Sequence, residues 1–456
     1  MRQCTAIVMG GGIGGLTAGV ALHRAGWSVT VLERARSLEP VGAGIALAPN
    51  AQRALDTIGA GDAVRAMAVW QVEGELRLPS GRRLARTDNA ASVRRFGGPV
   101  VVAHRADVVG LLASLLPEGT VRTGVTAELA EPGDPGDPAR PARVRLITSD
   151  AVPGVVPGVE SEVEPGVESE VEPGVESDVD ENGGHPPSNP SGNVPHLTAD
   201  LVVAADGIRS ATRRALFPGH PGPRYAGFTT WRVVVPTPDR PFPAHETWGP
   251  GQLWGTFPLY DGRTYAYGLA VLPPGGRAPD DERAELLRRF GNWHHPVPDI
   301  LRIADPAAVL RNDVYWMAHP LPAYHRGRVA LLGDAAHAMT PNLGQGGCQA
   351  IEDAIVLAHL AAPDADLAAA LRRYTDERLP RTMDVVRRAA RIARAVRWKA
   401  APVRALRAAV MTTMARCAPD LALRALDGIA DWRPPVGPYA AGTPDARPVT
   451  RTKEAP

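Results

Sequence analysis

The 456-residue sequence predicts an α/β (α+β) fold, with a parallel-sheet domain assembled from discontinuous segments, an inserted mixed sheet and a helical C-terminal region. Three observations predict this architecture. The chain opens with a strand, a glycine turn, a helix and a second strand over residues 5–34. Another buried strand runs into a glycine-rich helix start at 328–360. Between them, 227–272 alternates apolar and polar residues and is rich in Trp, Tyr and Phe, which is typical of strands.

Composition narrows the class of protein. With 50 Lys and Arg against 49 Asp and Glu, the formal net charge is +1, so no overall charge favours nucleic acid. Cys4, Cys348 and Cys417 are far apart and lack metal-ligand spacing, which indicates neither a disulfide scaffold nor a metal site. There is no bilayer-spanning apolar run and no signal-peptide pattern. We therefore expect a cytoplasmic protein with no metal and no nucleic-acid partner.

The first motif is a G-x-G-x-x-G turn between the opening strand and helix. Such a turn brings the backbone close to a pyrophosphate, which the helix N-terminus stabilises through its dipole and N–H groups. Glu33 ends the second strand, where a carboxylate accepts from ribose hydroxyls, and Arg34 could reach a phosphate or adenine. The sequence thus predicts a Rossmann-like dinucleotide site, without deciding between FAD and NAD. The residues expected at the phosphates are Gly10, Gly12, Ile13, Gly14 and Gly15.

A second motif, LLGDAAHAMTPNLGQGGCQAIEDA, spans residues 331–354. Its aspartate stands at a strand end, where it can accept from ribityl hydroxyls, and the helix that follows can direct N–H groups at the negative charge of a reduced flavin ring. That pairing favours a flavin over NAD. The cofactor contacts expected here are Gly333, Asp334, Pro341, Gly344, Gly346 and Gly347.

This second motif resembles the GD motif of the para-hydroxybenzoate hydroxylase-like, single-component FAD monooxygenases. It is most similar to the salicylate hydroxylase, zeaxanthin epoxidase and urate hydroxylase branch. A third family motif, ADLVVAADGIRSATRR at 199–214, contains the pair Asp206 and Gly207, which in the family supports the pyrophosphate and is implicated in nicotinamide-cofactor use. Many relatives have Asn where Cys348 stands; we expect Cys348 to be a packing residue rather than a nucleophile. The resemblance also implies FAD contacts from Gly44, Ile45 and Arg105.

The family resemblance implies a reaction. A single glycine fingerprint leaves NAD(P)H no domain of its own, so NAD(P)H must bind transiently over the same flavin. The resemblance then implies that NAD(P)H reduces FAD, dioxygen adds to it, and a flavin hydroperoxide hydroxylates or epoxidises an electron-rich, aromatic or polyketide-like small molecule. Two alternatives stay open: a flavin-dependent oxidase or reductase on the same scaffold, and a degenerate FAD-binding redox or interaction module.

Substrate contacts are expected on the aromatic sheet, because strand alternation would direct some side chains into a pocket. Arg232 could bind a carboxylate or phenolate, and a surface or salt-bridged arginine is an equal alternative. No catalytic residue is assigned, and His294, His295, Asp313 and His337 are expected to be structural. Trp231 and Tyr265 lie on the same expected sheet. The pocket candidates are Arg232, Trp254, Phe257, Tyr267 and Pro341.

Residues 157–180 are three near-copies of one acidic octad, beginning PGVESEVE. Acidic, proline-rich and without aromatics, this segment cannot bury enough apolar surface to offset its ordering entropy. We expect a disordered insertion that replaces a hairpin turn. The expected division is 1–130 and 196–222 for the FAD-binding domain, 131–195 for the insertion, 223–325 for the substrate sheet, 326–362 for the GD motif and helix, and 363–456 for C-terminal helices and tail.

The C-terminal region is basic: 387–416 contains many arginines and no acidic residue, and Pro402 should break its helix. A basic amphipathic helix can lie on an anionic membrane. It can equally be a solvated face. The default expectation is a helix that covers the flavin domain, with membrane association as the less favoured alternative.

Overall fold

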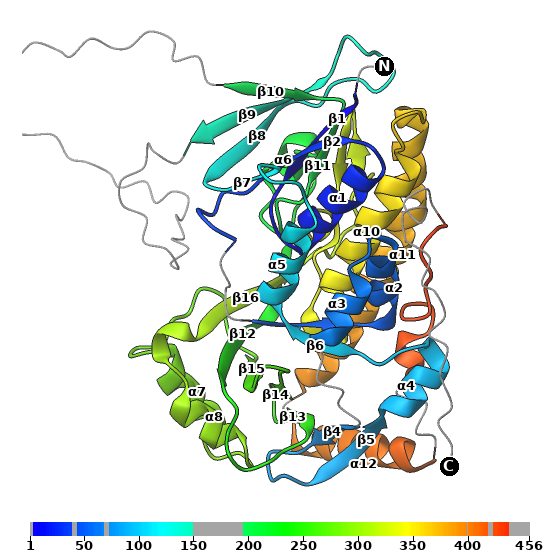
Figure 1. The fold of residues 1–456 in the computed structure, drawn as a ribbon. Helices are drawn as coiled ribbons and strands as arrows, with labels where there is room; N and C mark the ends of the chain where they lie inside the picture. Colours follow the sequence, from blue (N-terminus) through cyan, green and yellow to red (C-terminus); the bar gives the residue numbers. More distant parts are fainter. Residues whose placement is uncertain are drawn as a thin grey trace, which may run out of the picture.

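The computed structural model describes residues 3–38, 43–67, 73–148, 195–398, 400–417 and 423–436. Two large sheets lie at opposite ends of the molecule, with helices between and around them (Figure 1). The predicted α/β class is confirmed.

The first large sheet has six strands in the order β17-β18-β11-β1-β2-β7. β1 lies in the middle and pairs in parallel with both β11 and β2, and only the edge strand β17 is antiparallel. Its strands come from parts of the chain far apart in sequence, so the predicted discontinuous assembly is confirmed. Their bounds are β1 Thr5–Met9, β2 Ser28–Leu32, β7 Val121–Arg122, β11 Leu201–Ala204, β17 His325–Arg326 and β18 Val329–Leu331.

Helices α1 and α10 pack on each other beside this sheet because small residues let their backbones approach. A Cβ added at Gly14 of α1 would lie only 3.0 Å from the Cβ of Ala350 of α10. A short antiparallel pair, β3 Gly44–Leu47 and β6 Val101–His104, lies nearby. The helices of this half are α1 Ile13–Arg24, α2 Pro49–Thr57, α3 Gly61–Ala66, α5 Arg105–Ser114, α6 Ala211–Leu216, α9 Asp334–His337 and α10 Gly346–Leu360.

A three-stranded antiparallel sheet, β10-β9-β8, corrects the predicted extent of the insertion. The range 131–195 includes β9, whose Val144 lies opposite Leu197 of β10. The first residues of that range form the loop between β8 and β9. Buried Arg328 donates from Nε to the carbonyl oxygen of Asp134 at 2.8 Å and from Nη2 to that of Asp137 at 3.0 Å. The bounds are β8 Val125–Glu131, β9 Ala142–Thr148 and β10 His196–Ala199.

The octad repeat lies outside the described residues, within 149–194. The strands on either side of it, β9 and β10, pair as antiparallel neighbours, as the two arms of a hairpin do.

The second large sheet has seven strands in the order β16-β12-β15-β14-β13-β4-β5. It corrects the assignment of all of 1–130 to the FAD-binding domain, because β4 and β5 come from 73–88 and β4 pairs in parallel with β13. A short polar hairpin carries no local sign of the sheet it will join, since strand pairing depends on distant partners. The strands are β4 Glu73–Arg77, β5 Arg83–Asp88, β12 Arg224–Pro236, β13 Ala244–Trp248, β14 Gln252–Pro258, β15 Arg263–Ala270 and β16 Leu310–Trp316.

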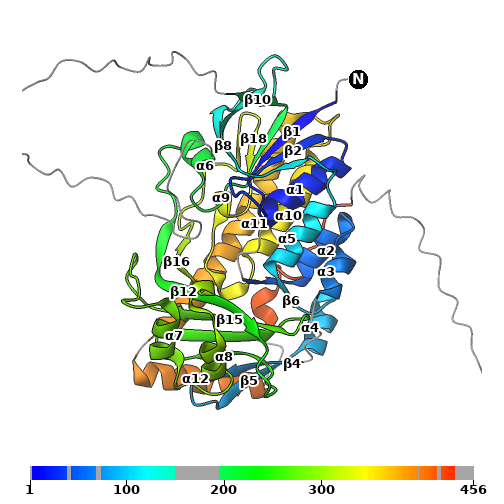
Figure 2. The same ribbon diagram turned by 60° about the vertical axis from the view of Figure 1, so that its left-hand side comes forward.

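Helices cover this second sheet on both faces. On one face lie α7 Glu282–Phe290 and α8 Val297–Ile303 (Figure 2). Leu286, Phe290 and other apolar residues of these helices form a core with Trp231 and Trp254 of the sheet. The other face packs against the C-terminal end of α11. The remaining short elements are α4 Asn89–Phe96, η2 Pro306–Ala308, η3 Pro341–Leu343 and η5 Leu423–Leu426.

Helix α11, Leu367–Val396, connects the two large sheets. Near its start the Tyr374 hydroxyl donates to the carbonyl oxygen of Leu331 in β18 at 2.9 Å, and at its end Val396 packs with Phe228 of β12. α12, Ala401–Cys417, then begins with Pro402 in its first turn, which confirms the predicted break. None of the helices in the described ranges is both long and apolar enough to cross a membrane.

Candidate cofactor and substrate site

The turn between β1 and α1 has the shape that the glycine motif predicts. Gly10 has a φ of +113°, and a Cβ there would lie 2.4 Å from the carbonyl oxygen of Ala205 at the end of β11. Gly12 is different, because the nearest atom to a Cβ at this position would be Arg105 Nη2, at 3.9 Å. The turn is therefore closely packed against β11 at Gly10 and open at Gly12, just before α1 begins at buried Ile13. An open backbone at a helix N-terminus is the geometry that accepts a phosphate.

Glu33 holds this turn through both of its carboxylate oxygens. Oε2 accepts from the Gly11 N–H at 2.6 Å and Oε1 from the Ala35 N–H at 2.9 Å. Each oxygen has a further lone pair that a ribose hydroxyl could use. Arg34 is exposed next to it.

The GD motif lies at the carboxyl end of β18, in the same sheet as β1. Gly333 has a φ of +59°, and its N–H donates to Asp353 Oδ2 at 3.0 Å. Asp334 then begins α9 with an exposed side chain. The motif continues through exposed Pro341 and through Gly344, which has a φ of +62°, to the start of α10.

The start of α10 is in contact with β3. A Cβ added at Gly347 would lie 2.7 Å from Ile45 Cδ1. The Cys348 thiol is buried, 3.5 Å from the carbonyl oxygens of Ala46 and Gly344. Burial raises the pKa of Cys348 to about 12, so the thiol stays protonated at neutral pH. Cys348 is a packing residue, as predicted.

The DG motif follows β11 and joins the same region. Asp206 Oδ2 accepts from the Thr212 N–H at 3.1 Å, and its Oδ1 is buried with no hydrogen-bond partner in the described part of the chain. Buried Arg213 donates from Nη1 to the carbonyl oxygen of Ala335 at 3.0 Å, which connects the DG loop to the GD motif.

Strand alternation divides the aromatic residues of the seven-stranded sheet between its two faces. Arg232 lies opposite Tyr267 and Phe257 opposite Tyr265, so these four side chains share the face that looks toward the FAD-binding half. Trp254 lies on the other face. It is fully buried, with its ring centroid 5.2 Å from that of Phe290 in α7. Trp254 is therefore a core residue, and its prediction as a pocket residue is wrong because alternation could not tell which face is covered.

Tyr267 lies flat across its neighbouring strand. A Cβ at Gly255 would be 2.4 Å from the Tyr267 ring, so only glycine leaves room for it. The Tyr267 hydroxyl donates to Glu246, and Phe257 stacks on the ring with centroids 6.0 Å apart. Burial and then the Glu246 carboxylate raise the pKa of Tyr267 well above its usual value.

Cofactor and substrate candidates converge around Arg105 at the start of α5. Desolvation and then Arg232 lower the pKa of Arg105, while Asp334 and Glu33 act in the opposite direction. The four charged groups are thus close enough to interact, although they come from both halves of the molecule. Contact between the halves is direct at Gly44, where a Cβ would lie 2.3 Å from the Tyr265 ring.

The three histidines and the aspartate that are expected to be structural form hydrogen bonds within the fold, as predicted. His294 Nε2 is 2.8 Å from Thr247 Oγ1, and His295 Nδ1 is 2.8 Å from Asp299 Oδ2. Asp313 accepts from the Thr229 hydroxyl and from the Gly275 N–H. His337 is buried against Asp353, with Nε2 and Oδ2 2.5 Å apart.

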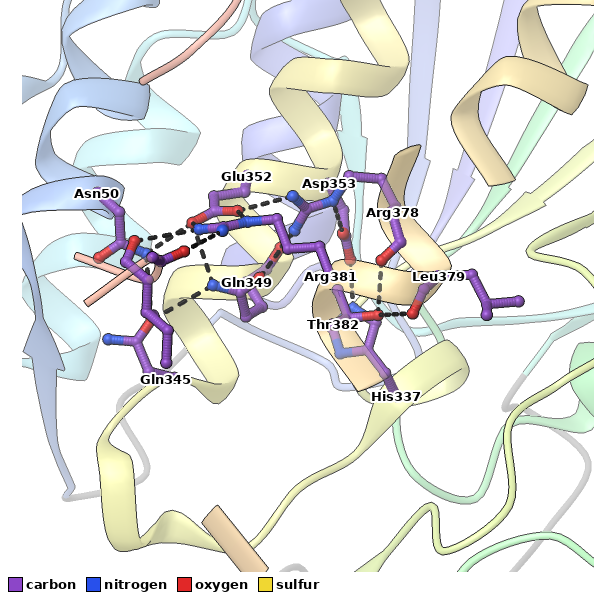
Figure 3. Close-up of polar contacts among 12 residues, drawn as sticks. Asn50, His337, Gln345, Gln349, Glu352, Asp353, Arg378, Leu379, Arg381 and Thr382 are labelled. Carbon is purple, nitrogen blue, oxygen red and sulfur yellow. Dashed lines mark hydrogen bonds and ion pairs between the residues drawn. The ribbon is translucent and has the colours of Figure 1, made fainter. Parts of the chain in front are cut away.

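A buried ionic network behind the GD motif was not predicted (Figure 3). Arg378 of α11 donates from Nε to Asp353 and from Nη1 to Glu352, both at 2.7 Å, and Arg381 donates to both oxygens of Glu352. Burial would raise the pKa of Asp353, but His337 and Arg378 lower it to about 2. A signal was present: adjacent carboxylates in an otherwise apolar, buried helix need cationic partners. Asn50, Gln345 and Gln349 complete the network.

The fold and the site define a class of protein, a flavoprotein with one glycine-motif nucleotide domain facing an aromatic sheet. Comparison with known proteins supports this class. Residues 3–104 and 311–389 match the family model described as FAD binding domain. These two ranges contain the glycine turn, Glu33 and the GD motif.

Similar proteins identify the family. The chain is 34% identical to aurachin C monooxygenase/isomerase of Stigmatella aurantiaca, over 87% of this chain and 90% of that protein. It is 31% identical to an FAD-dependent urate hydroxylase of Klebsiella pneumoniae, over 84% of this chain and 88% of that protein. The structure of Klebsiella pneumoniae HpxO with FAD and uric acid superposes with a TM-score of 0.73 at 26% identity, covering 94% of this chain and 96% of that one. The chain belongs to the FAD-dependent, aromatic hydroxylase-like monooxygenases.

Proposed function

We propose that the chain uses NAD(P)H and dioxygen to oxygenate a small electron-rich aromatic or heteroaromatic molecule. This molecule would bind between the cofactor-binding turns, which contain Gly12, Glu33 and Asp334, and the seven-stranded sheet. The observation that carries the proposal is that β3 contacts both halves: a Cβ at Gly44 would lie 2.3 Å from the Tyr265 ring of the sheet, and a Cβ at Gly347 of the GD motif would lie 2.7 Å from Ile45 Cδ1. The names of relatives, which include aurachin C, urate and 3-amino-4-hydroxybenzoate enzymes, support a cyclic conjugated substrate.

The residues of the cofactor-binding turns fit FAD. The open backbone at Gly12 would receive the pyrophosphate. The Asp206 backbone N lies beside the same turn, 3.4 Å from the position of a Cβ at Gly10, and the buried Asp206 Oδ1, which has no hydrogen-bond partner in the described residues, could accept from a cofactor hydroxyl. Glu33 would bind the adenosine ribose, exposed Asp334 the ribityl chain, and the N–H groups at Gly346 and Gly347 the flavin ring. Bound FAD would supply the activation of dioxygen with electrons from NAD(P)H.

Arg232 is the group best suited to bind the substrate. Nη2 donates to Asn312 Oδ1 at 2.5 Å, whereas Nε is buried with no hydrogen-bond partner in the described residues. A buried donor without a partner is costly, and an oxygen of a ligand would satisfy it. With Arg105 nearby, the site favours a phenolate, carboxylate or polarised carbonyl oxygen.

Tyr265 would act as a hydrogen-bond donor rather than as a base. Burial raises the pKa of Tyr265 to about 12, while Arg232 acts to lower it, so Oη keeps its proton at neutral pH. The hydroxyl could then donate to the same substrate oxygen as Arg232. The stacked rings of Phe257 and Tyr267 would exclude water from the remaining surface of the substrate.

The assignment of Asp334 is tested by FAD retention. We expect Asp334→Ala to weaken FAD binding by at least about 1.5–3 kcal/mol, the range for a lost hydrogen bond to a charged group. Asp62→Ala removes a fully exposed carboxylate and should retain FAD. Fluorescence titration of apoprotein with FAD measures both variants. Wild-type affinity in Asp334→Ala would contradict the assignment.

The reaction is tested by oxygen labelling. Phenols, aromatic acids and polyketides are screened for stimulated oxidation of NADH or NADPH, and products formed under labelled dioxygen are analysed by mass spectrometry. One labelled oxygen per product supports a monooxygenase, whereas hydrogen peroxide as the only oxygen product supports an oxidase. Arg232→Met should raise KM for an anionic substrate by roughly tenfold or more, with exposed Arg240→Met as the control.

A further inference from the structure

The outward face of α12 is apolar along its described length. Leu406 is 65% exposed, Val410 46% and Val403 39%, and Trp398 just before the helix is 46% exposed. Four of the eleven large hydrophobic side chains exposed in the described residues therefore lie within 398–410. Such clustering marks an interaction surface rather than scattered exposure. The exposed residues of the helix are Ala401, Pro402, Val403, Ala405, Leu406, Ala409, Val410 and Thr413.

The two arginines of α12 whose side chains are described, Arg404 and Arg407, point the opposite way. Arg407 is 9% exposed; its Nη1 donates to the carbonyl oxygen of Ala395 at 2.8 Å, and its guanidinium lies 5.1 Å from the Trp248 ring centroid. Arg404 is partly buried, with its Nε shielded from solvent. Arg404 and Arg407 therefore do not form a solvated basic face. A helix that turns its charges inward and its apolar residues outward is inverted relative to a solvent-facing helix.

Positive charge borders this apolar face. α12 packs against β5, where Arg82 at the preceding turn, Arg83 and Arg86 are exposed. Arg391, Arg394 and Arg397 are exposed near the end of α11. Both views place α12 at the end of the molecule away from the six-stranded sheet (Figures 1 and 2). The apolar face is thus at a molecular end, with cations on neighbouring elements.

The charge distinguishes between possible partners. In a symmetric dimer formed through this face, arginines bordering one copy would approach arginines bordering the other, and like charges repel. An anionic lipid surface would neutralise them while accepting the apolar side chains between its headgroups.

We propose that α12 docks on the surface of an anionic lipid bilayer. Trp398, Val403, Leu406 and Val410 enter the boundary between headgroups and acyl chains, and the arginines of β5 and of the end of α11 contact lipid phosphates. The helix lies in the plane of the membrane. This inference does not depend on the proposed reaction.

Vesicle co-sedimentation of the FAD-loaded protein tests the proposal. Phosphatidylcholine vesicles containing about one third phosphatidylglycerol should bind the protein, and pure phosphatidylcholine vesicles should bind it much less. The double variant Leu406→Glu, Val410→Glu should lose binding by about tenfold or more. Ile303→Glu on α8 changes a side chain that is 47% exposed elsewhere and should bind as the wild type does. Leu406→Ser is a milder second variant, and melting temperature and FAD content verify folding.

Three results would overturn the proposal. The first is no binding to either kind of vesicle. The second is equal binding to both, which would exclude recognition of anionic lipid. The third is a dimer in light scattering that Leu406→Ser dissociates, because a second copy would then cover the face.

Discussion

Replacing Arg378 with methionine should destabilise the protein by about 3–5 kcal/mol, because removal of one partner from a buried ion pair leaves a charge uncompensated. Arg378 is 1% exposed, and both carboxylates that it contacts are fully buried. Glu352 would keep Arg381 at 2.7 Å, whereas Asp353 would keep only His337 and the Gly333 N–H. Most of the lost stability should therefore come from the uncompensated charge of Asp353. The turn that contains Asp334 should be affected too, because Asp353 accepts from the Gly333 N–H in that turn.

The pH dependence of the same variant is a second readout. The lowered pKa of Asp353, about 2, means that its ionised form is favoured in the folded protein. Such a group stabilises the fold above its unfolded pKa of about 3.9 and loses that contribution as pH falls toward the folded value. The shift in the pKa of Asp353 corresponds to about 2.5 kcal/mol. Without Arg378 the pKa of Asp353 should rise, so acid unfolding should begin at a higher pH.

Urea unfolding followed by tryptophan fluorescence, repeated from neutral pH to the acid limit, measures both effects. Arg373→Met is the matched control, since Arg373 lies on the same helix in an exposed pair with Glu377 and should contribute less than about 1 kcal/mol. Equal stability of the two variants, with coincident acid transitions, would refute the role assigned to Arg378.

Three further outcomes are expected. Gly44→Val should lower FAD affinity and cost about 1–3 kcal/mol of stability, since its Cβ would overlap the Tyr265 ring at 2.3 Å. Fluorescence titration and melting measure this, and recovery in Gly44→Val, Tyr265→Ala would confirm the contact. Cys348 should resist iodoacetamide at pH 8 in the folded protein, because burial raises its pKa to about 12; labelling mapped by mass spectrometry would show otherwise. Replacing residues 150–193 with Asn-Gly should leave the flavin spectrum and melting temperature nearly unchanged, because β9 and β10 already pair. Loss of folded protein would show that the segment is structural.

Local patterns predicted the parts of the site that depend on neighbouring residues. The turn at Gly10 needs a positive φ and lies beside β11, and both requirements appear in the sequence as a glycine between a buried strand and a helix. The GD turn is similar, since Gly333 and Asp334 follow β18 directly. The structure agrees with the sequence prediction at these two turns because their shape depends only on residues that are neighbours in the sequence.

Features that depend on distant partners were not predictable in the same way. Alternation correctly divided the aromatic strands into two faces, but only the packing of α7 shows that Trp254 is covered. Glu352 finds its cations on another helix, at Arg378 and Arg381. β4 joins β13 across a long stretch of chain. In each case the sequence shows that a strand or side chain needs a partner, but only the tertiary structure shows which partner it has.

The inward arginine of α12 connects the proposed membrane surface to the substrate face. Arg407 lies over Trp248, whose indole N–H donates to Glu246 Oε2 at 3.1 Å, and Glu246 also accepts from the Tyr267 hydroxyl. An arginine on a helix is usually expected to face solvent. In α12, however, the Arg407 guanidinium lies against an indole ring, while Leu406 and Val410 are exposed. Three consecutive contacts thus join Arg407 of α12 to Tyr267, which lies opposite Arg232 in the sheet.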